Sequence, residues 1–214
     1  MGSETRTSRF DGFGFLLADG PSANARLPLS MRIIAGQYRS RKLVAPPGTA
    51  TRPTSDRLRE TLFNILADSV MDSVWLDLFA GSGAIGIEAL SRGARMVYFV
   101  ETQSRAVKAI RSNLSSLSVK EGYELQDREV GQALRALDAA AVLADFCFLD
   151  PPYSHYGAYE QTLGFLSQSR LLGADSIVIA EHDKHQDLLE RYGALERYRK
   201  LRQGDAMLSF YRLG

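Results

Sequence analysis

The sequence Asp150-Pro151-Pro152-Tyr153 follows a short apolar run and combines groups that can act on an amine. The two prolines stiffen the turn and hold the preceding aspartate in an extended conformation. The Asp150 carboxylate and the Pro151 carbonyl can then both accept hydrogen bonds from one amino group, while Tyr153 stacks on a planar ring. Two acceptors stabilise the positive charge that develops on the nitrogen in the transition state. The quartet predicts chemistry on the exocyclic amine of a nucleobase, and the alternative is an ordinary proline-rich loop.

A glycine turn lies upstream of this quartet. Residues 74–80 are apolar except for Asp77, and Gly81, Gly83 and Gly86 after them fit the pattern G-x-G-x-x-G. A helical pattern follows, so the stretch predicts a strand, a tight turn and a helix, the first βα unit of a doubly wound sheet. Small residues there let the backbone approach a ligand at the helix N-terminus. Several nucleotide cofactors use this motif, and a tight turn without a ligand has the same glycines.

The carboxylate of Asp77 favours one class of ligand over the others. An acid just before the glycine turn repels a pyrophosphate and attracts a cation. S-adenosylmethionine carries a sulfonium and an ammonium group and no phosphate. The acidic glycine turn therefore predicts S-adenosylmethionine as the cofactor, in preference to NAD or FAD.

Two further carboxylates follow predicted strands. Glu101 comes directly after residues 96–100, and Asp127 comes directly after residues 123–126. Open α/β sheets bind ligands at the carboxyl ends of their strands, so we expect Glu101 to accept the ribose hydroxyls and Asp127 to accept the adenine amine. A dinucleotide site would use Glu101 in the same way, and Asp127 could equally be a helix N-cap.

Alternating strand and helix patterns run from the glycine turn to the end of the chain. Before it we expect a basic hairpin within residues 31–44 and a helix capped by Thr54 or Ser55. Further strands are expected at 96–100, 123–126, 145–149 and 176–180, with an antiparallel pair at 195–201 and 206–211. Helices are expected at 106–117, 157–171 and 184–191, and another follows the strand at 123–126 and ends at Leu137. Cys147 falls inside a central strand and is expected in the core, which argues against a thiolate nucleophile.

Composition limits the class of protein. The chain has 214 residues, 45% of them hydrophobic, with one cysteine and three histidines that lack metal-ligand spacing. These values predict a cytoplasmic protein with one core, no metal, no membrane span and no disulfide. We expect residues 1–30 to be a disordered extension or an artificial or upstream-start leader. Residues 31–70 would form a basic hairpin and helix, and residues 71–214 the catalytic domain.

Basic residues are concentrated near the start of the patterned sequence. Residues 31–60 hold seven basic and two acidic residues, whereas residues 61–214 hold 16 basic and 20 acidic residues. A basic arm on a mildly acidic domain indicates a polyanionic partner such as RNA. Charge alone fits a solvated basic face equally well.

Three stretches of the sequence resemble a known family. They are Arg52-Pro-Thr-Ser-Asp-Arg-Leu-Arg-Glu-Thr-Leu-Phe-Asn64, residues 76–94 around the glycine turn, and Asp150-Pro-Pro-Tyr153. Together they resemble the bacterial 16S rRNA guanine-N2 methyltransferases of the small-subunit methyltransferase D type. The resemblance covers about residues 31–214, and the first stretch is its most specific part, because many amino-group methyltransferases share the other two.

The resemblance implies a doubly wound, seven-stranded, Rossmann-like class I methyltransferase fold with a small N-terminal hairpin and helix. It implies S-adenosylmethionine as methyl donor and a guanine of 16S rRNA, free or in the small subunit, as acceptor for a monomeric enzyme. The implied contacts are Asp77, Phe79, Ala80, Gly81 and Gly83 to the methionine moiety, Glu101 to the ribose, Asp127 to the adenine, Asp150, Pro151 and Tyr153 to the guanine, and Arg39, Arg41, Lys42, Arg52 and Arg57 to RNA phosphates.

Other functions fit parts of the pattern. An adenine-N6 methyltransferase acting on DNA or RNA could use the same quartet. An NAD(P)-dependent oxidoreductase would use the glycine turn and Glu101, but Asp77 and the lack of a credible proton donor weigh against it. A catalytically silent RNA-binding module is disfavoured by the intact quartet. Thermal stabilisation by S-adenosylhomocysteine or by NAD distinguishes the two enzyme classes.

Overall fold

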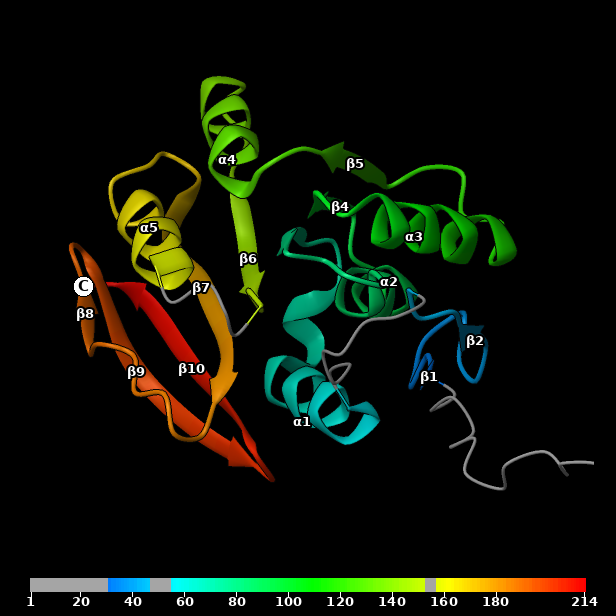
Figure 1. The fold of residues 1–214 in the computed structure, drawn as a ribbon, viewed down its shortest axis with the longest axis horizontal. Helices are drawn as coiled ribbons and strands as arrows, with labels where there is room; N and C mark the ends of the chain where they lie inside the picture. Colours follow the sequence, from blue (N-terminus) through cyan, green and yellow to red (C-terminus); the bar gives the residue numbers. More distant parts are fainter. Residues whose placement is uncertain (1–30, 47–54, 153–156) are drawn as a thin grey trace, which may run out of the picture.

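A mostly parallel sheet forms the centre of the computed structural model, which describes residues 31–46, 55–152 and 157–214 (Figure 1). The strand order is β5-β4-β3-β6-β7-β10-β9-β8, with β5 to β7 parallel and β10 inserted antiparallel between β7 and β9. The strands are β3 (Val74–Leu78), β4 (Met96–Glu101), β5 (Tyr123–Asp127), β6 (Ala144–Leu149), β7 (Leu172–Asp183), β8 (Arg191–Tyr192), β9 (Leu195–Gln203) and β10 (Ala206–Leu213). The seven predicted strands are present, and the two-residue β8 is an addition.

Helices cover both faces of this sheet, as a doubly wound fold requires. They are α1 (Asp56–Leu66), the 3₁₀ turn η1 (Ala67–Val70), α2 (Ala84–Ser91), α3 (Ser104–Ser116), α4 (Val130–Ala139) and α5 (Gly157–Leu166). Buried residues of α1, α2 and α3 pack in one hydrophobic cluster, and those of α4 and α5 pack in a second cluster across the sheet. No helix in the described part of the chain is long and apolar enough to cross a membrane.

The predicted βα unit is β3, the glycine turn and α2. Every residue of α2 is buried, because the helix lies directly against β4. A Cβ added to Gly86 would lie 2.3 Å from the ring of Phe99 and 2.6 Å from Val97, so the third glycine is required for helix–sheet packing. Gly83, at the start of the helix, has φ +76°, a conformation that favours glycine.

The N-terminal hairpin consists of β1 (Met31–Arg32) and β2 (Lys42–Leu43), which pair antiparallel as predicted. The hairpin is fixed to α2 by Glu88, whose carboxylate accepts from the Ile34 N–H at 2.7 Å and the Ala35 N–H at 3.0 Å. A Cβ on Gly36 (φ +83°) would lie 1.8 Å from the carbonyl oxygen of Ser91. The backbone of the hairpin therefore touches the helix that follows the glycine turn.

Helix α1 begins at the predicted cap and joins the core. The Ser55 hydroxyl accepts from the Leu58 N–H at 3.2 Å, which completes the N-cap. The ring of Phe63 stacks on Trp75 of β3, with 5.3 Å between ring centroids. The other proposed cap, Thr54, lies outside the described residues.

The predicted helix at 184–191 is wrong. The Asp183 carboxylate accepts from the His185 N–H at 2.8 Å and the Asp183 carbonyl accepts from the Gln186 N–H, so the local side chain takes up backbone groups that a helix would use. This segment is a turn that leads into β8. Two other boundaries also differ, because α5 ends at Leu166 and β7 begins at Leu172.

Cys147 lies in β6 with no exposed surface, as predicted for a core residue. Burial raises the pKa of its thiol well above the ordinary value, and the nearby charge of Asp77 raises it further. Neither effect favours a thiolate, so Cys147 is not a nucleophile.

Candidate active site

Carboxylates end several neighbouring strands on one face of the sheet. Glu101 of β4 is paired in register with Asp127 of β5, and Asp77 of β3 is paired with Phe99 of β4. Phe99 and Trp75, two residues before Glu101 and Asp77, belong to the hydrophobic cluster that also holds α1, α2 and α3. Since side chains alternate along a strand, the carboxylates also point toward that face.

Two more acids continue this row. The register of β6 and β7 ends with the pair Leu149 and Ala180. The next residue on each segment is an acid, so Asp150, directly after β6, lies beside Glu181 of β7. Neighbouring strands lie about 5 Å apart. Glu181 was not singled out in the sequence, although it follows its strand core directly, as Glu101 and Asp150 do.

A cleft of about 740 Å³ opens along this edge of the sheet. This volume is typical of small-molecule sites. It is lined by seven of the ten residues predicted to contact cofactor or base, namely Asp77, Phe79, Ala80, Gly81, Glu101, Asp150 and Pro151. Asp127 and Gly83 are not part of its lining, and residues 129–131 at the start of α4 line it instead. Tyr153 lies outside the described residues.

Asp77 is buried at the bottom of the glycine turn, with 1% of its surface exposed. One carboxylate oxygen accepts from the Gly86 N–H at 2.9 Å, which fixes the start of α2 on the end of β3. Burial raises the pKa of Asp77 to about 8, the Gly86 hydrogen bond lowers it in part, and the charge of Glu101 raises it. No described basic side chain forms an ion pair with it. A cationic ligand would supply the missing charge.

Glu101 holds the glycine turn as well as facing the cleft. One oxygen accepts from the Gly81 N–H at 2.8 Å, and the other accepts from the N–H groups of Thr102 and Gln103, each at 2.8 Å. A carboxylate offers about four lone-pair positions, so these three bonds leave one for a ligand. That Glu101 binds the ribose hydroxyls stays a prediction, and the described conformation leaves one acceptor position for them.

The backbone of the glycine turn is shaped for close approach. Phe79 has φ +59°, and Gly81 has φ +57°. A positive φ at a bulky residue such as phenylalanine costs on the order of 1–3 kcal/mol and occurs mostly at functional sites. Phe79 has this conformation at the wall of the cleft, two residues after Asp77.

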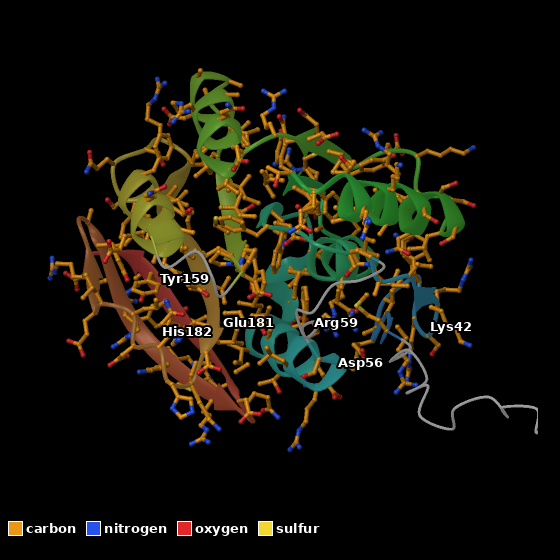
Figure 2. All side chains as sticks on the ribbon, in the orientation of Figure 1. Lys42, Asp56, Arg59, Tyr159, Glu181 and His182 are labelled. Atoms are coloured by element: carbon orange, nitrogen blue, oxygen red, sulfur yellow. The ribbon has the colours of Figure 1, made fainter. Side chains whose placement is uncertain are left out.

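Asp150 lines the far end of the cleft, and Glu181, which is not part of the lining, lies beside it at the end of β7. Burial raises the pKa of Asp150 well above the ordinary value, and the charges of Glu181 and Asp77 raise it further. The Tyr159 hydroxyl of α5 donates to the Glu181 carbonyl at 2.6 Å and fixes this end of β7 (Figure 2). The chain thus places an aspartate with increased basicity where the predicted amine would lie.

The described residues predicted to bind RNA do not line the cleft themselves. Arg39, Lys42 and Arg57 are exposed, and Figure 2 shows Lys42 on the hairpin, away from Glu181. The exposed Arg41 donates to the Ser116 carbonyl at the end of α3 at 2.8 Å, so part of its role is to cap that helix. Arg52 lies outside the described residues.

Arg59, which contributed to the basic count of the arm, is not available to RNA. Its side chain is fully buried, donates to the Arg32 carbonyl at 2.8 Å and pairs with Asp56 at 2.5 Å and with Glu88 at 3.8 Å. The exposed charge of the arm is therefore smaller than the sequence indicated.

Residues 31–212 match the protein family described as conserved hypothetical protein 95. The chain belongs to this family. A relative from Escherichia coli named ribosomal RNA small subunit methyltransferase D is 35% identical over 158 residues, which are 74% of this chain and 77% of the relative. The match to the family leaves out residues 1–30, as the resemblance of the motifs did.

Solved structures support the same assignment. The Escherichia coli protein yhhF, a candidate methyltransferase, has a TM-score of 0.72 at 29% identity, over 86% of this chain and 98% of that protein. A Thermus thermophilus 16S rRNA N2 methyltransferase, solved with AdoMet and guanosine, has a TM-score of 0.65 at 21% identity, over 86% of this chain and 50% of that chain. At that identity the likeness concerns the fold. The predicted family and the predicted methyltransferase fold are confirmed.

Proposed function

We propose that this chain transfers a methyl group from S-adenosylmethionine to the exocyclic N2 amine of a guanine in small-subunit ribosomal RNA. Membership of a methyltransferase family rules out the oxidoreductase alternative, and S-adenosylmethionine is the cofactor. One observation carries the proposal that the acceptor is an amine. Asp150 and Pro151 line the same cleft as the glycine turn and Glu101, so a cofactor on the turn and an amine on Asp150 would share one cavity.

The residues of the cleft fit this cofactor. S-adenosylmethionine supplies an electrophilic methyl group on a sulfonium centre. The buried Asp77 carboxylate, without a cationic partner among the described residues, suits its positive charges. Phe79, Ala80 and Gly81 would surround the methionine moiety, and the remaining lone pair of Glu101 would accept from one ribose hydroxyl. For the adenine, residues 129–131 are better placed than Asp127, because they line the cleft.

At the acceptor end, Asp150 and the Pro151 carbonyl would accept from the two hydrogens of the base amine. This arrangement concentrates the nitrogen lone pair toward the methyl group and stabilises positive charge as the N–C bond forms. The nitrogen must then lose one proton. The increased basicity of Asp150 makes its ionised carboxylate a better proton acceptor than an ordinary aspartate.

The neighbour of Asp150 supports guanine over adenine. Guanine carries two adjacent donors, N1–H and the N2 amine, whereas adenine has an unprotonated N1 beside its amine. Glu181 stands one strand away from Asp150 on the same face of the sheet. A carboxylate reaching the base from the position of Glu181 would accept from the N1–H of guanine beside the amine on Asp150, whereas the N1 lone pair of adenine would repel it.

Methyl transfer from labelled cofactor tests the proposal. The substrates are naked 16S rRNA, small-subunit particles and DNA, followed by digestion to nucleosides. We expect labelled N2-methylguanosine from an RNA substrate, formed about 10²–10³ times more slowly by Asp150→Ala. Labelled N6-methyladenosine would support the adenine alternative instead, and an absence of label in every nucleoside of rRNA would overturn the proposal.

A further inference from the structure

The side chain of Asn113, on α3, joins two segments that are far apart in the sequence. It is 1% exposed and sits on the apolar face of the helix. Its Oδ1 accepts from the Val44 N–H at 2.8 Å. Its Nδ2 donates to the Val44 carbonyl at 3.1 Å and to the Ser82 carbonyl at 3.0 Å. Asn113 therefore ties the residue after β2 to the middle of the glycine turn.

This set of partners specifies an amide. Val44 and Ser82 together offer one N–H donor and two carbonyl acceptors, which matches one amide oxygen and the two hydrogens of one amide nitrogen. Turning the amide around would place its nitrogen against the Val44 N–H, so its orientation is determined. A buried apolar side chain would leave three backbone groups without a partner, each at a cost of about 1–3 kcal/mol.

Both segments form the wall of the cleft. Ser82 lines it from the glycine turn, and Ala45 and Pro46, directly after Val44, line it from the N-terminal arm. Val44 itself has 59% of its surface exposed, although its backbone is held by Asn113. We call residues 42–46, which begin with Lys42, the rim segment. A cofactor in the cleft would touch this segment and the glycine turn at once.

We propose that Asn113 is a positioning residue that couples cofactor binding in the cleft to the docking of the rim segment, so that cofactor and RNA bind cooperatively. The docked rim segment carries the exposed Lys42 and Val44 directly before Ala45 and Pro46, which line the cleft. A cofactor that contacts the docked form better than an undocked form shifts the segment toward docking. By linkage, RNA that binds the docked segment raises cofactor affinity by the same factor. The RNA part of this inference rests on the proposed function.

Hydrogen exchange at the Val44 amide tests the coupling without RNA. S-adenosylhomocysteine should slow exchange of this amide in the wild type, since the Val44 N–H is protected only while the rim segment is docked on Asn113. Unchanged exchange at a saturating concentration of S-adenosylhomocysteine would overturn the inference, whatever the protein does with RNA.

Binding experiments test the cooperativity. RNA affinity is measured with and without S-adenosylhomocysteine, and we expect an increase of about 5- to 150-fold in the wild type. Asn113→Ala should reduce this factor to about one, in addition to any loss in the affinity for cofactor alone or for RNA alone. Asn113→Asp would place a carboxylate oxygen against the Val44 and Ser82 carbonyls and repel both, so it should lose the factor and the protection of the Val44 amide together.

Asn64→Ala is the matched control, because Asn64 is an exposed asparagine on α1. It should retain the wild-type factor. A variant that weakens each affinity but keeps the factor would show that Asn113 only stabilises the fold, and this would overturn the inference. A wild type that shows slowed Val44 exchange and binds no RNA would instead overturn the proposed function.

Discussion

Replacement of Asp77 by asparagine should change the pH dependence of cofactor binding. The asparagine side chain would be uncharged and nearly the same shape, and its oxygen can still accept from the Gly86 N–H. In the wild type, burial raises the pKa of Asp77 to about 8. The carboxyl group is therefore mostly protonated at neutral pH in the free protein and must ionise to pair with the positive charges of S-adenosylmethionine.

The size of the effect follows from the ionised fraction. With a pKa of about 8, roughly half of Asp77 is ionised at pH 8 and roughly one hundredth at pH 6. Apparent affinity scales with the fraction of protein that is competent to bind, so it should rise about 50-fold from pH 6 to pH 8. In Asp77→Asn the rise should largely disappear, and affinity at pH 8 should fall below that of the wild type.

Titration calorimetry in buffers of different ionisation enthalpy measures both quantities. At pH 7 the wild type should release close to one proton for each cofactor bound, and Asp77→Asn should release much less. Wild-type affinity that stays constant between pH 6 and pH 8 would refute the reasoning. A wild-type pH dependence that persists unchanged in the variant would assign it to another group, with Asp150 the first to examine.

The same pKa predicts an effect on stability. A group whose pKa is raised on folding contributes stability that is fully present below its unfolded pKa, about 4, and is lost as the pH rises through its folded pKa, about 8. The ligand-free Asp77→Asn variant should therefore be more stable than the wild type near pH 9, by on the order of a few kcal/mol, in denaturant unfolding. Equal stability at that pH would contradict the buried-acid account.

Three further predictions concern the acceptor site, the arm and the hairpin. Asp150→Ala should lower kcat by about 10²–10³ with little change in cofactor affinity, measured by single-turnover methyl transfer. Neutralising Arg39 and Lys42 together should flatten the slope of log RNA affinity against log salt by about 1.4 to 1.8, and an unchanged slope would mark these residues as a solvated face. Gly36→Ala should destabilise the fold by more than the ~1–3 kcal/mol of a strained backbone, because its Cβ would overlap a carbonyl of α2. Thermal melts of both variants test this. Gly204 has φ +67° and nothing within 4 Å of an added Cβ, so Gly204→Ala should be destabilised only by the strained backbone.

Local pattern was sufficient for the βα unit that carries the cofactor. The apolar run at residues 74–80, the three glycines and Asp77 all indicate the same strand, turn and helix, so local and tertiary preferences agree there. Pattern failed at residues 184–191, which were expected to form a short helix. There a short-range hydrogen bond from the His185 N–H to Asp183 and a long-range one, from the Lys184 N–H to the Asp205 carbonyl, hold the backbone in a turn.

The position of a site residue was easier to predict than its partners. Glu101 lies in the cleft as expected, but its three backbone donors come from turns whose geometry the sequence does not reveal. Glu181 could have been found by asking which acid follows each predicted strand. Asn113 left no such signal, because a single asparagine in a helix has an ordinary pattern until the segments that meet it are known.

The buried position of Cys147 makes the protein suitable for single-site labelling. It is the sole cysteine of the sequence, it has no exposed surface, and its raised pKa keeps the thiol protonated. Maleimide and iodoacetamide reagents react with accessible thiolates, so the folded wild type should remain unlabelled. One cysteine introduced at an exposed hairpin position such as Ser40 would then carry a fluorophore alone, without removal of the native residue. Motions of the hairpin could be followed in solution with an otherwise unaltered chain.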